Sequence, residues 1–275
     1  MKKARKNYLL VTALILLFFY APQLEAQEEQ KPPQYYTVTT LHWNMDYDGE
    51  EDWLEIEKEF LNKVTKKNEY ILASIYFGHR WTNDNSELLL LNVYADWESI
   101  DKGNKRNNEL AKLAWPDKAA RQAYFNKRDA FYATYHSDEI YAVLPGSKHN
   151  PAANGKDRIL YYQTSHFAFP EDGSQEEFEK LHLEYVNNVI NKNDLIVGYY
   201  PHAHAWGSDK REFKEAYILN SMSDLIKMND KNDEISEAFW KGKDEARKEY
   251  YKKWFKYTTG FHRDAIYTEI TELKK

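Results

Sequence analysis

Two histidines at alternate positions of one segment are the residues best placed to build a single chemical site. Residues 199 to 206 read YYPHAHAW, which places His202, His204 and Trp206 on one face of an extended chain. Imidazoles at this spacing stand about 6–7 Å apart along a strand and can reach one metal ion or one ligand. The spacing singles out no third metal ligand. The segment therefore predicts either a metal centre or polar anchors for an organic ligand.

A second pattern joins histidine to aspartate. His136 and Asp138 lie two residues apart, and His262 and Asp264 repeat the pattern near the C-terminus. A carboxylate beside an imidazole fixes its tautomer and raises its basicity, which a general base requires. A hydrogen bond at the end of a strand would explain the same spacing. These four residues are candidate catalytic groups, with a structural role as the alternative.

The histidines recur because the chain contains an internal repeat. The stretch YHSDEIY (135–141) returns as FHRDAIY (261–267), and KKNEYI (66–71) returns as NKNDLI (191–196). Matching positions keep nearly one offset, and its small drift needs only single-residue insertions in loops. The repeat pairs His42 with His166, His79 with His204, His136 with His262, and Trp81 with Trp206.

Each copy of the repeat predicts the order strand, helix, strand, strand, helical region, strand. Apolar residues three and four apart predict a helix between Trp53 and Val64, and runs rich in β-branched, aromatic or leucine residues predict the strands. Pro116 is expected to divide the long helical region of residues 100–135. The predicted segments are a first repeat at 35–144, a linker at 145–157 and a second repeat at 158–275.

Two βαββαβ units in one chain resemble the ferredoxin-like unit of the dimeric α+β barrel superfamily. That superfamily includes antibiotic-biosynthesis-type monooxygenases and NIPSNAP-like proteins, and the resemblance rests on element order and duplication without a family motif. It implies an α+β fold in which two tandem ferredoxin-like units form an intramolecular pseudo-dimeric barrel. Helices cover one face of each sheet, so the other face needs an apolar partner, which the second unit supplies. Two independent domains on a flexible linker are the alternative.

The N-terminal residues are typical of a secretory signal peptide. Four basic residues precede an apolar run from Tyr8 to Ala21, and cleavage is expected after Ala26. Residues 1–26 would then be the signal peptide and 27–34 a flexible tail. The mature protein would be periplasmic or secreted, with no retained membrane anchor, because the run is shorter than a bilayer span of about 20 residues.

Composition narrows the classes of partner and chemistry. The chain carries a net charge of −6, which argues against nucleic acid as a partner. It has no cysteine, which excludes disulfides, thiolate metal sites and a cysteine nucleophile. Its aromatic content of 16% supports a large packed core. Composition leaves both a monomer and a homo-oligomer open, and it identifies no cofactor.

Three functions fit these observations. The leading hypothesis is an exported protein that binds a small, partly apolar ligand in a cavity lined by histidines and aromatic residues. The alternatives are a cofactor-independent monooxygenase-like enzyme and a metal-binding protein that uses His202 and His204. Trp81 is also expected to stabilise the fold by burial. The residues expected to line the cavity are His42, His79, Trp81, His166, His202, His204 and Trp206.

Overall fold

The structure is a computed structural model that describes residues 34–149 and 156–275. The predicted signal peptide, nearly all of the predicted tail and the middle of the predicted linker lie outside the described residues. Within these two ranges, no helix combines the length and the hydropathy needed to cross a membrane. Residues from Pro33 to the C-terminus cluster into one compact unit.

The order of elements within each repeat confirms the sequence prediction. In the first repeat the elements are β1 (Tyr35–His42), α2 (Trp53–Lys63), β2 (Ala73–Trp81), β3 (Glu87–Tyr94), α3 (Trp97–Ala114), α4 (Lys118–Ala130) and β4 (Ser137–Val143). In the second they are β5 (Ile159–Phe167), α5 (Gln175–Asn188), β6 (Gly198–Trp206), β7 (Glu212–Leu219), α6 (Met222–Trp240), α7 (Asp244–Lys256) and β8 (Thr258–Glu269). Pro116 lies between α3 and α4. Proline has no backbone N–H to donate, so the helical region is interrupted there.

Short polar side chains set where five of the six α-helices in the described ranges begin. Each accepts a hydrogen bond from a backbone N–H of the first turn, a group that has no partner inside the helix. These N-cap residues are Asp52, Asp96, Asp117, Ser174 and Ser221. The helices therefore start at positions that local sequence specifies.

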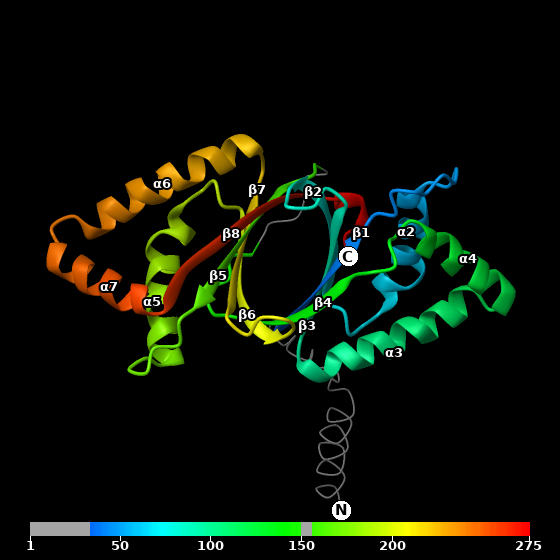
Figure 1. Cartoon of the computed structure of the whole chain (residues 1–275), viewed down its shortest axis with the longest axis horizontal. Helices are drawn as coiled ribbons and strands as arrows, with labels where there is room; N and C mark the ends of the chain where they lie inside the picture. The colour runs from blue at the N-terminus through cyan, green and yellow to red at the C-terminus, as the bar shows by residue number, and fades with distance from the viewer. Residues whose placement is uncertain (1–33, 150–155) are drawn as a thin grey trace, which may run out of the picture. The chain divides into compact units, whose positions relative to one another are not determined.

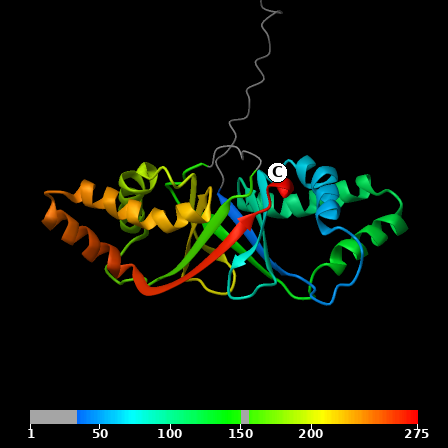
Figure 2. The same ribbon diagram turned by 90° about the horizontal axis from the view of Figure 1, so that it is seen from above.

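The eight strands form one closed antiparallel barrel in the order β1-β3-β2-β8-β5-β7-β6-β4. The repeats join where β2 pairs with β8 and where β4 pairs with β6. Sequence reasoning predicted two sheets packed face to face, and the structure adds hydrogen-bonded seams that leave no free sheet edge. Figures 1 and 2 show α2, α3 and α4 outside one half of the barrel and α5, α6 and α7 outside the other.

A buried asparagine explains one of the repeated sequence segments. The amide of Asn68 donates to a backbone carbonyl of α3 and to the side chain of Asn107, and its oxygen accepts from a nearby backbone N–H. Asn193 makes the same three bonds, with Asn232 in place of Asn107. Both asparagines are fully buried. The KKNEYI and NKNDLI segments therefore share one structural task, which ties the loop before β2 or β6 to a helix.

Strand residues alone fill the apolar interior of the barrel. The buried side chains of this cluster come from seven of the eight strands, and none of the described helices contributes to it: Val38, Phe77, Leu89, Tyr141, Leu160, Tyr162, Ala216, Ile218 and Tyr267. The opposite faces of the strands pack under the helices, as Leu88 does in the first repeat and Leu219 in the second. Both faces of most strands are therefore buried.

Candidate functional site

A cavity of about 310 Å³ lies at the end of the barrel where the β2–β3 and β6–β7 turns are found. Both repeats contribute to its walls, and Val38, Leu89 and Ala265 give it small apolar patches. The remaining lining is mostly hydroxyl, amide and charged groups. Six charged side chains line it: Glu87, Glu139, Glu212, Asp264, Lys214 and Arg263. These walls are more polar than the histidine and aromatic lining that the sequence predicted.

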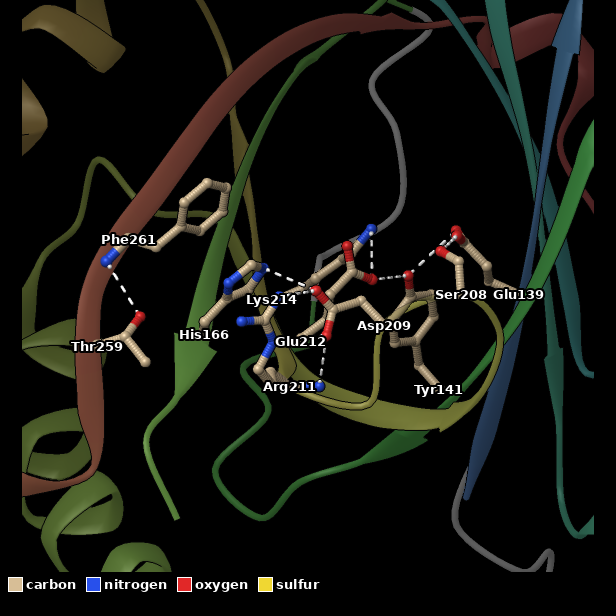
Figure 3. A network of polar contacts seen from close by, with 10 residues as sticks. All are labelled: Glu139, Tyr141, His166, Ser208, Asp209, Arg211, Glu212, Lys214, Thr259 and Phe261. Carbon is tan, nitrogen blue, oxygen red and sulfur yellow. Dashed lines mark hydrogen bonds and ion pairs between the residues drawn. The ribbon is translucent and has the colours of Figure 1, made fainter. Parts of the chain in front are cut away.

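Lys214 and Glu212 of β7 form a buried ion pair in this cavity (Figure 3). The Lys214 Nζ lies 3.4 Å from Glu212 Oε2, and the two residues are 5% and 8% exposed. The ammonium also lies 4.8 Å from the ring centroid of Tyr141 and 5.2 Å from that of Tyr162. Burial lowers the pKa of Lys214, and the neighbouring Glu212 carboxylate opposes that shift.

Tyr141 of β4 joins this pair to a second carboxylate. Its hydroxyl donates to Glu212 Oε2 at 2.6 Å and lies 3.1 Å from Glu139 Oε2. Burial raises the pKa of Tyr141, so the phenol keeps its proton. Ser208, in the β6–β7 turn, donates to the other oxygen of Glu139 (Figure 3). Two carboxylates and an amine therefore line one wall of the cavity, and the phenol of Tyr141 links the two carboxylates without lining the cavity itself.

The repeat shows which of these groups the fold itself requires. The bond from Tyr141 to Glu212 has a counterpart across the barrel, where Tyr267 donates to Glu87 at 3.0 Å. Other cavity groups have apolar residues at the matching position. Three such differences are Lys214 against Leu89, Glu139 against Ala265, and Tyr162 against Val38. The tyrosine to glutamate bonds belong to the barrel, whereas the lysine and its surroundings are specific to one side.

His202 is fully buried inside the barrel. Its Nδ1 donates to the carbonyl of Tyr200 at 2.9 Å, so its Nε2 accepts from the hydroxyl of Tyr162 at 2.8 Å. Burial lowers the pKa of His202 to about 3, and the ring is neutral at pH 7. Both nitrogens are engaged. His202 therefore orients Tyr162 and has no lone pair left for a metal ion.

The other residues predicted on this strand face, His204 and Trp206, lie in different environments from His202. His204 is half-buried, and its Nε2 has no hydrogen-bond partner among residues 34–149 and 156–275. Trp206 and its counterpart Trp81 are 67% and 68% exposed. The predicted burial of Trp81 is therefore wrong. Both tryptophans end their strands at the rim of the barrel, where the alternation of a strand no longer places a side chain in an enclosed interior.

His42 is the one predicted ligand-binding residue that lines the cavity. Its Nδ1 lies 3.2 Å from Asp84 Oδ2 and 3.1 Å from Ser86 Oγ. His166 repeats the pairing with Asp209, at 3.4 Å, but does not line the cavity. His79 bonds to Thr82 at 2.7 Å through its Nδ1. His42, His166 and His79 thus contact residues of the turns, and of these three only His42 also faces the cavity.

The predicted catalytic pairs are exposed to solvent. His136 Nε2 is 3.1 Å from Asp138 Oδ2, and His262 Nε2 is 3.8 Å from Asp264 Oδ2, with all four side chains at least 44% exposed. Only Asp264 of the four lines the cavity. Across the described ranges, no three histidine, aspartate or glutamate side chains are grouped so as to hold a metal ion.

Sequence reasoning missed Lys214, Glu212, Glu139 and Arg263. A usable signal was present, because Lys214 interrupts the apolar strand EFKEAYIL at a position where the other repeat has leucine. Charges at such positions are rare inside a sheet unless they are paired or used. Comparing the two repeats at alternate strand positions would have found the lysine.

Comparisons with known proteins identify the fold. No protein-family model matches the sequence, and no curated protein matches it. A putative monooxygenase from Fusobacterium nucleatum superposes with a TM-score of 0.54 at 9% identity, covering 86% of this chain and 93% of that one. A mutant chlorite dismutase from Candidatus Nitrospira defluvii gives 0.50 at 11% identity, covering 86% and 91%. The chain has the dimeric α+β barrel fold. At these identities the likeness concerns the fold alone.

Proposed function

We propose that the protein is exported and binds a small polar molecule in the barrel cavity. The observation that carries this proposal is that Lys214 and Glu139 line the cavity at positions where the other repeat has an apolar residue. These matching residues are Leu89 and Ala265. Lys214 is buried whereas Glu139 is half-buried, and a buried charge is costly in free energy even when it is paired. A barrel that folds with apolar residues at the matching positions has no structural need of them.

The chemistry of the walls favours a ligand with both donors and acceptors. Glu139 and Glu212 accept hydrogen bonds, whereas Lys214 and Arg263 donate them, and Val38 and Leu89 offer limited apolar contact. A cavity of about 310 Å³ is at the small end of the range for ligand pockets. We therefore revise the sequence-based expectation of a partly apolar ligand toward a compact polar one.

A ligand screen by thermal shift tests the binding proposal. The purified protein would be heated with small carboxylic acids, polyols and phenols, and a true ligand should raise its melting temperature with concentration. Replacing Lys214 by Met should remove that shift. Replacing the surface residue Lys210 by Met is the matched control and should preserve it. A shift that survives in Lys214→Met would place the binding site elsewhere.

Export rests on the signal-like order of residues 1–26, which lie outside the described residues. N-terminal sequencing of the native protein should find a chain that begins near Gln27. An intact Met1 on the native protein would contradict export, and the binding proposal would stand without it.

A second candidate is a cofactor-independent, monooxygenase-like enzyme. The observation that favours it is His42, which lines the cavity while Asp84 and Ser86 hold its Nδ1. A histidine held in this way has Nε2 available as a general base. Oxygen uptake with hydroquinones would test this function, and His42→Asn should abolish it. If the unmodified protein shows no turnover, the enzyme function is contradicted and only the binding function stands.

A further inference from the structure

We propose that Lys214 forms a reversible imine with a small 2-oxo acid that occupies the barrel cavity. This inference rests on the proposed binding function and deepens it by naming the ligand class. It begins from Lys214 as the one primary amine among the described residues that line the cavity. Its ammonium is packed against the faces of Tyr141 and Tyr162 and beside Glu212.

The surroundings of Lys214 favour a nucleophilic amine. The side chain is 6% exposed, and water therefore solvates its charged form poorly. Burial and the charge of Arg263 both lower the pKa of Lys214, while Glu212 and Glu139 oppose them. A lysine desolvated in a pocket near another cation is a recurrent arrangement for attack on carbonyl carbon.

Glu212 is placed to move the protons of this reaction. Its carboxylate, 3.4 Å from the Lys214 Nζ, accepts the proton that the ammonium must lose. The free amine attacks the carbonyl carbon, and the proton that the attacking nitrogen loses passes to the former carbonyl oxygen, which gives a neutral carbinolamine. The carboxylic acid then donates a proton to the departing hydroxyl, which leaves as water when the C=N bond forms. No oxidant or reductant enters these steps.

Arg263 supplies the reason for a carboxylate on the ligand. Its guanidinium lines the same cavity, is exposed, and makes no hydrogen bond or ion pair within the described ranges. Arginine binds carboxylates through two parallel hydrogen bonds. A carbonyl for Lys214 and a carboxylate for Arg263 in one small cavity point to a short oxo acid, and a 2-oxo acid is the most compact of these.

Reductive trapping tests the imine. The full protein is incubated with pyruvate and then treated with sodium borohydride, which converts an imine to a stable secondary amine. Intact mass and peptide mapping should find one reduced pyruvate adduct, on Lys214. Lys148 is the internal control, because burial also lowers its pKa but it lies outside the cavity. Labelling of Lys148 at the same extent as Lys214 would overturn the proposal.

Variants separate the roles of the two cations. Lys214→Met should lose the adduct completely, whereas Lys148→Met should keep it. Arg263→Gln should reduce trapping of pyruvate by about tenfold more than it reduces trapping of acetaldehyde, because acetaldehyde reports only the change in reactivity of Lys214, whereas pyruvate also loses one charge-assisted pair. Equal losses with both probes would remove the carboxylate argument. Circular dichroism of each variant checks folding, and Lys214→Arg provides a second, charge-conserving replacement.

Binding measured without borohydride distinguishes the two proposals. If pyruvate shifts the melting temperature but leaves no adduct on Lys214, the imine is wrong and the binding function stands. If neither pyruvate nor the wider screen produces a shift that depends on Lys214, the binding function fails as well. If pyruvate forms an adduct on Lys214 and a ligand from the screen lowers the yield of that adduct, both proposals are supported.

Discussion

The first repeat buries an ion pair between its helices and its sheet. Glu57 of α2 is 1% exposed and accepts two hydrogen bonds from the guanidinium of Arg128, at 2.6 and 3.0 Å. The hydroxyls of Tyr76 and Tyr132 also donate to this carboxylate. Four polar side chains therefore satisfy one another in a layer where Glu57 is buried and the Arg128 side chain is only 17% exposed.

The second repeat fills the same layer with aromatic rings. His182 stands where the first repeat has Glu57, and Trp254 stands where it has Arg128. The His182 ring stacks on Phe178 and Trp254, and its Nε2 lies 2.9 Å from the hydroxyl of Tyr199. Burial lowers the pKa of His182 to about 4. The pair of charges is thus replaced by a neutral imidazole and an indole, while the Glu215 carboxylate accepts hydrogen bonds from the hydroxyls of Tyr199 and Tyr217.

The comparison separates what the fold requires from what it tolerates. Both repeats keep the hydrogen bonds of the buried asparagine, which is Asn68 in the first and Asn193 in the second. Both also keep a tyrosine to glutamate bond inside the barrel. The helix-facing layer and the cavity wall differ between the two repeats. Positions that keep one chemistry hold strands and loops in register, because any replacement would leave a buried backbone or side-chain group unpaired. Positions that changed are free to serve stability or function.

The largest effect is expected from Glu57→Ala. It leaves the buried charge of Arg128 without a partner, and we expect a loss of about 3–5 kcal/mol in the free energy of unfolding. Urea denaturation monitored by tryptophan fluorescence measures it. The double variant with Met at both positions imitates the apolar solution of the second repeat and should recover most of the loss. A double variant as unstable as Glu57→Ala would show that the two layers are not interchangeable.

The matched asparagines should respond alike. Asn68→Ala and Asn193→Ala each remove three buried hydrogen bonds and leave their partners unmet, so each should lower the free energy of unfolding by about 2–3 kcal/mol. The same urea titration compares them. Clearly unequal losses would contradict the view that both repeats use this residue for one structural task.

The pH dependence of stability should reveal His182. The folded protein keeps this ring neutral down to about pH 4, whereas the unfolded chain takes up a proton near the ordinary histidine pKa of 6.5. Its contribution is complete above pH 6.5 and is lost as the pH falls toward 4. Between pH 7 and pH 5, His182→Gln should lose about 2 kcal/mol less stability than the unmodified protein. Parallel pH profiles would count against a neutral buried ring.

The smallest effects are expected at the tryptophans of the rim. Trp81 and Trp206 are both mostly exposed, so replacing either by Ala should change the free energy of unfolding by only about 0.5 kcal/mol. Sequence reasoning expected Trp81 to be buried, and a much larger loss was implied. Thermal denaturation of the two variants decides between these values. A loss of several kcal/mol in either one would mean that a partner covers the rim.

The order of the strands and helices along the chain was predictable from the sequence. The environment that each face of a strand meets was not. The apolar periodicity, the position of Pro116 and the repeated segments are local features, and they placed the elements correctly. The facing failed because β6 is apolar on both faces, so alternation could not say how far the barrel encloses His202, His204 and Trp206. The lysine was missed because a single charge in a strand usually lies at a solvent-exposed position.

The sequence by itself determined two βαββαβ units, because periodicity and helix caps act over a few residues. Tertiary structure decided where the site lies. Tyr141 of β4 and Glu212 of β7 lie 71 residues apart and are separated by β6 in the sheet, and closure of the barrel turns both side chains into one interior. The bond between them depends on barrel curvature and on the register of both seams, which no local pattern encodes.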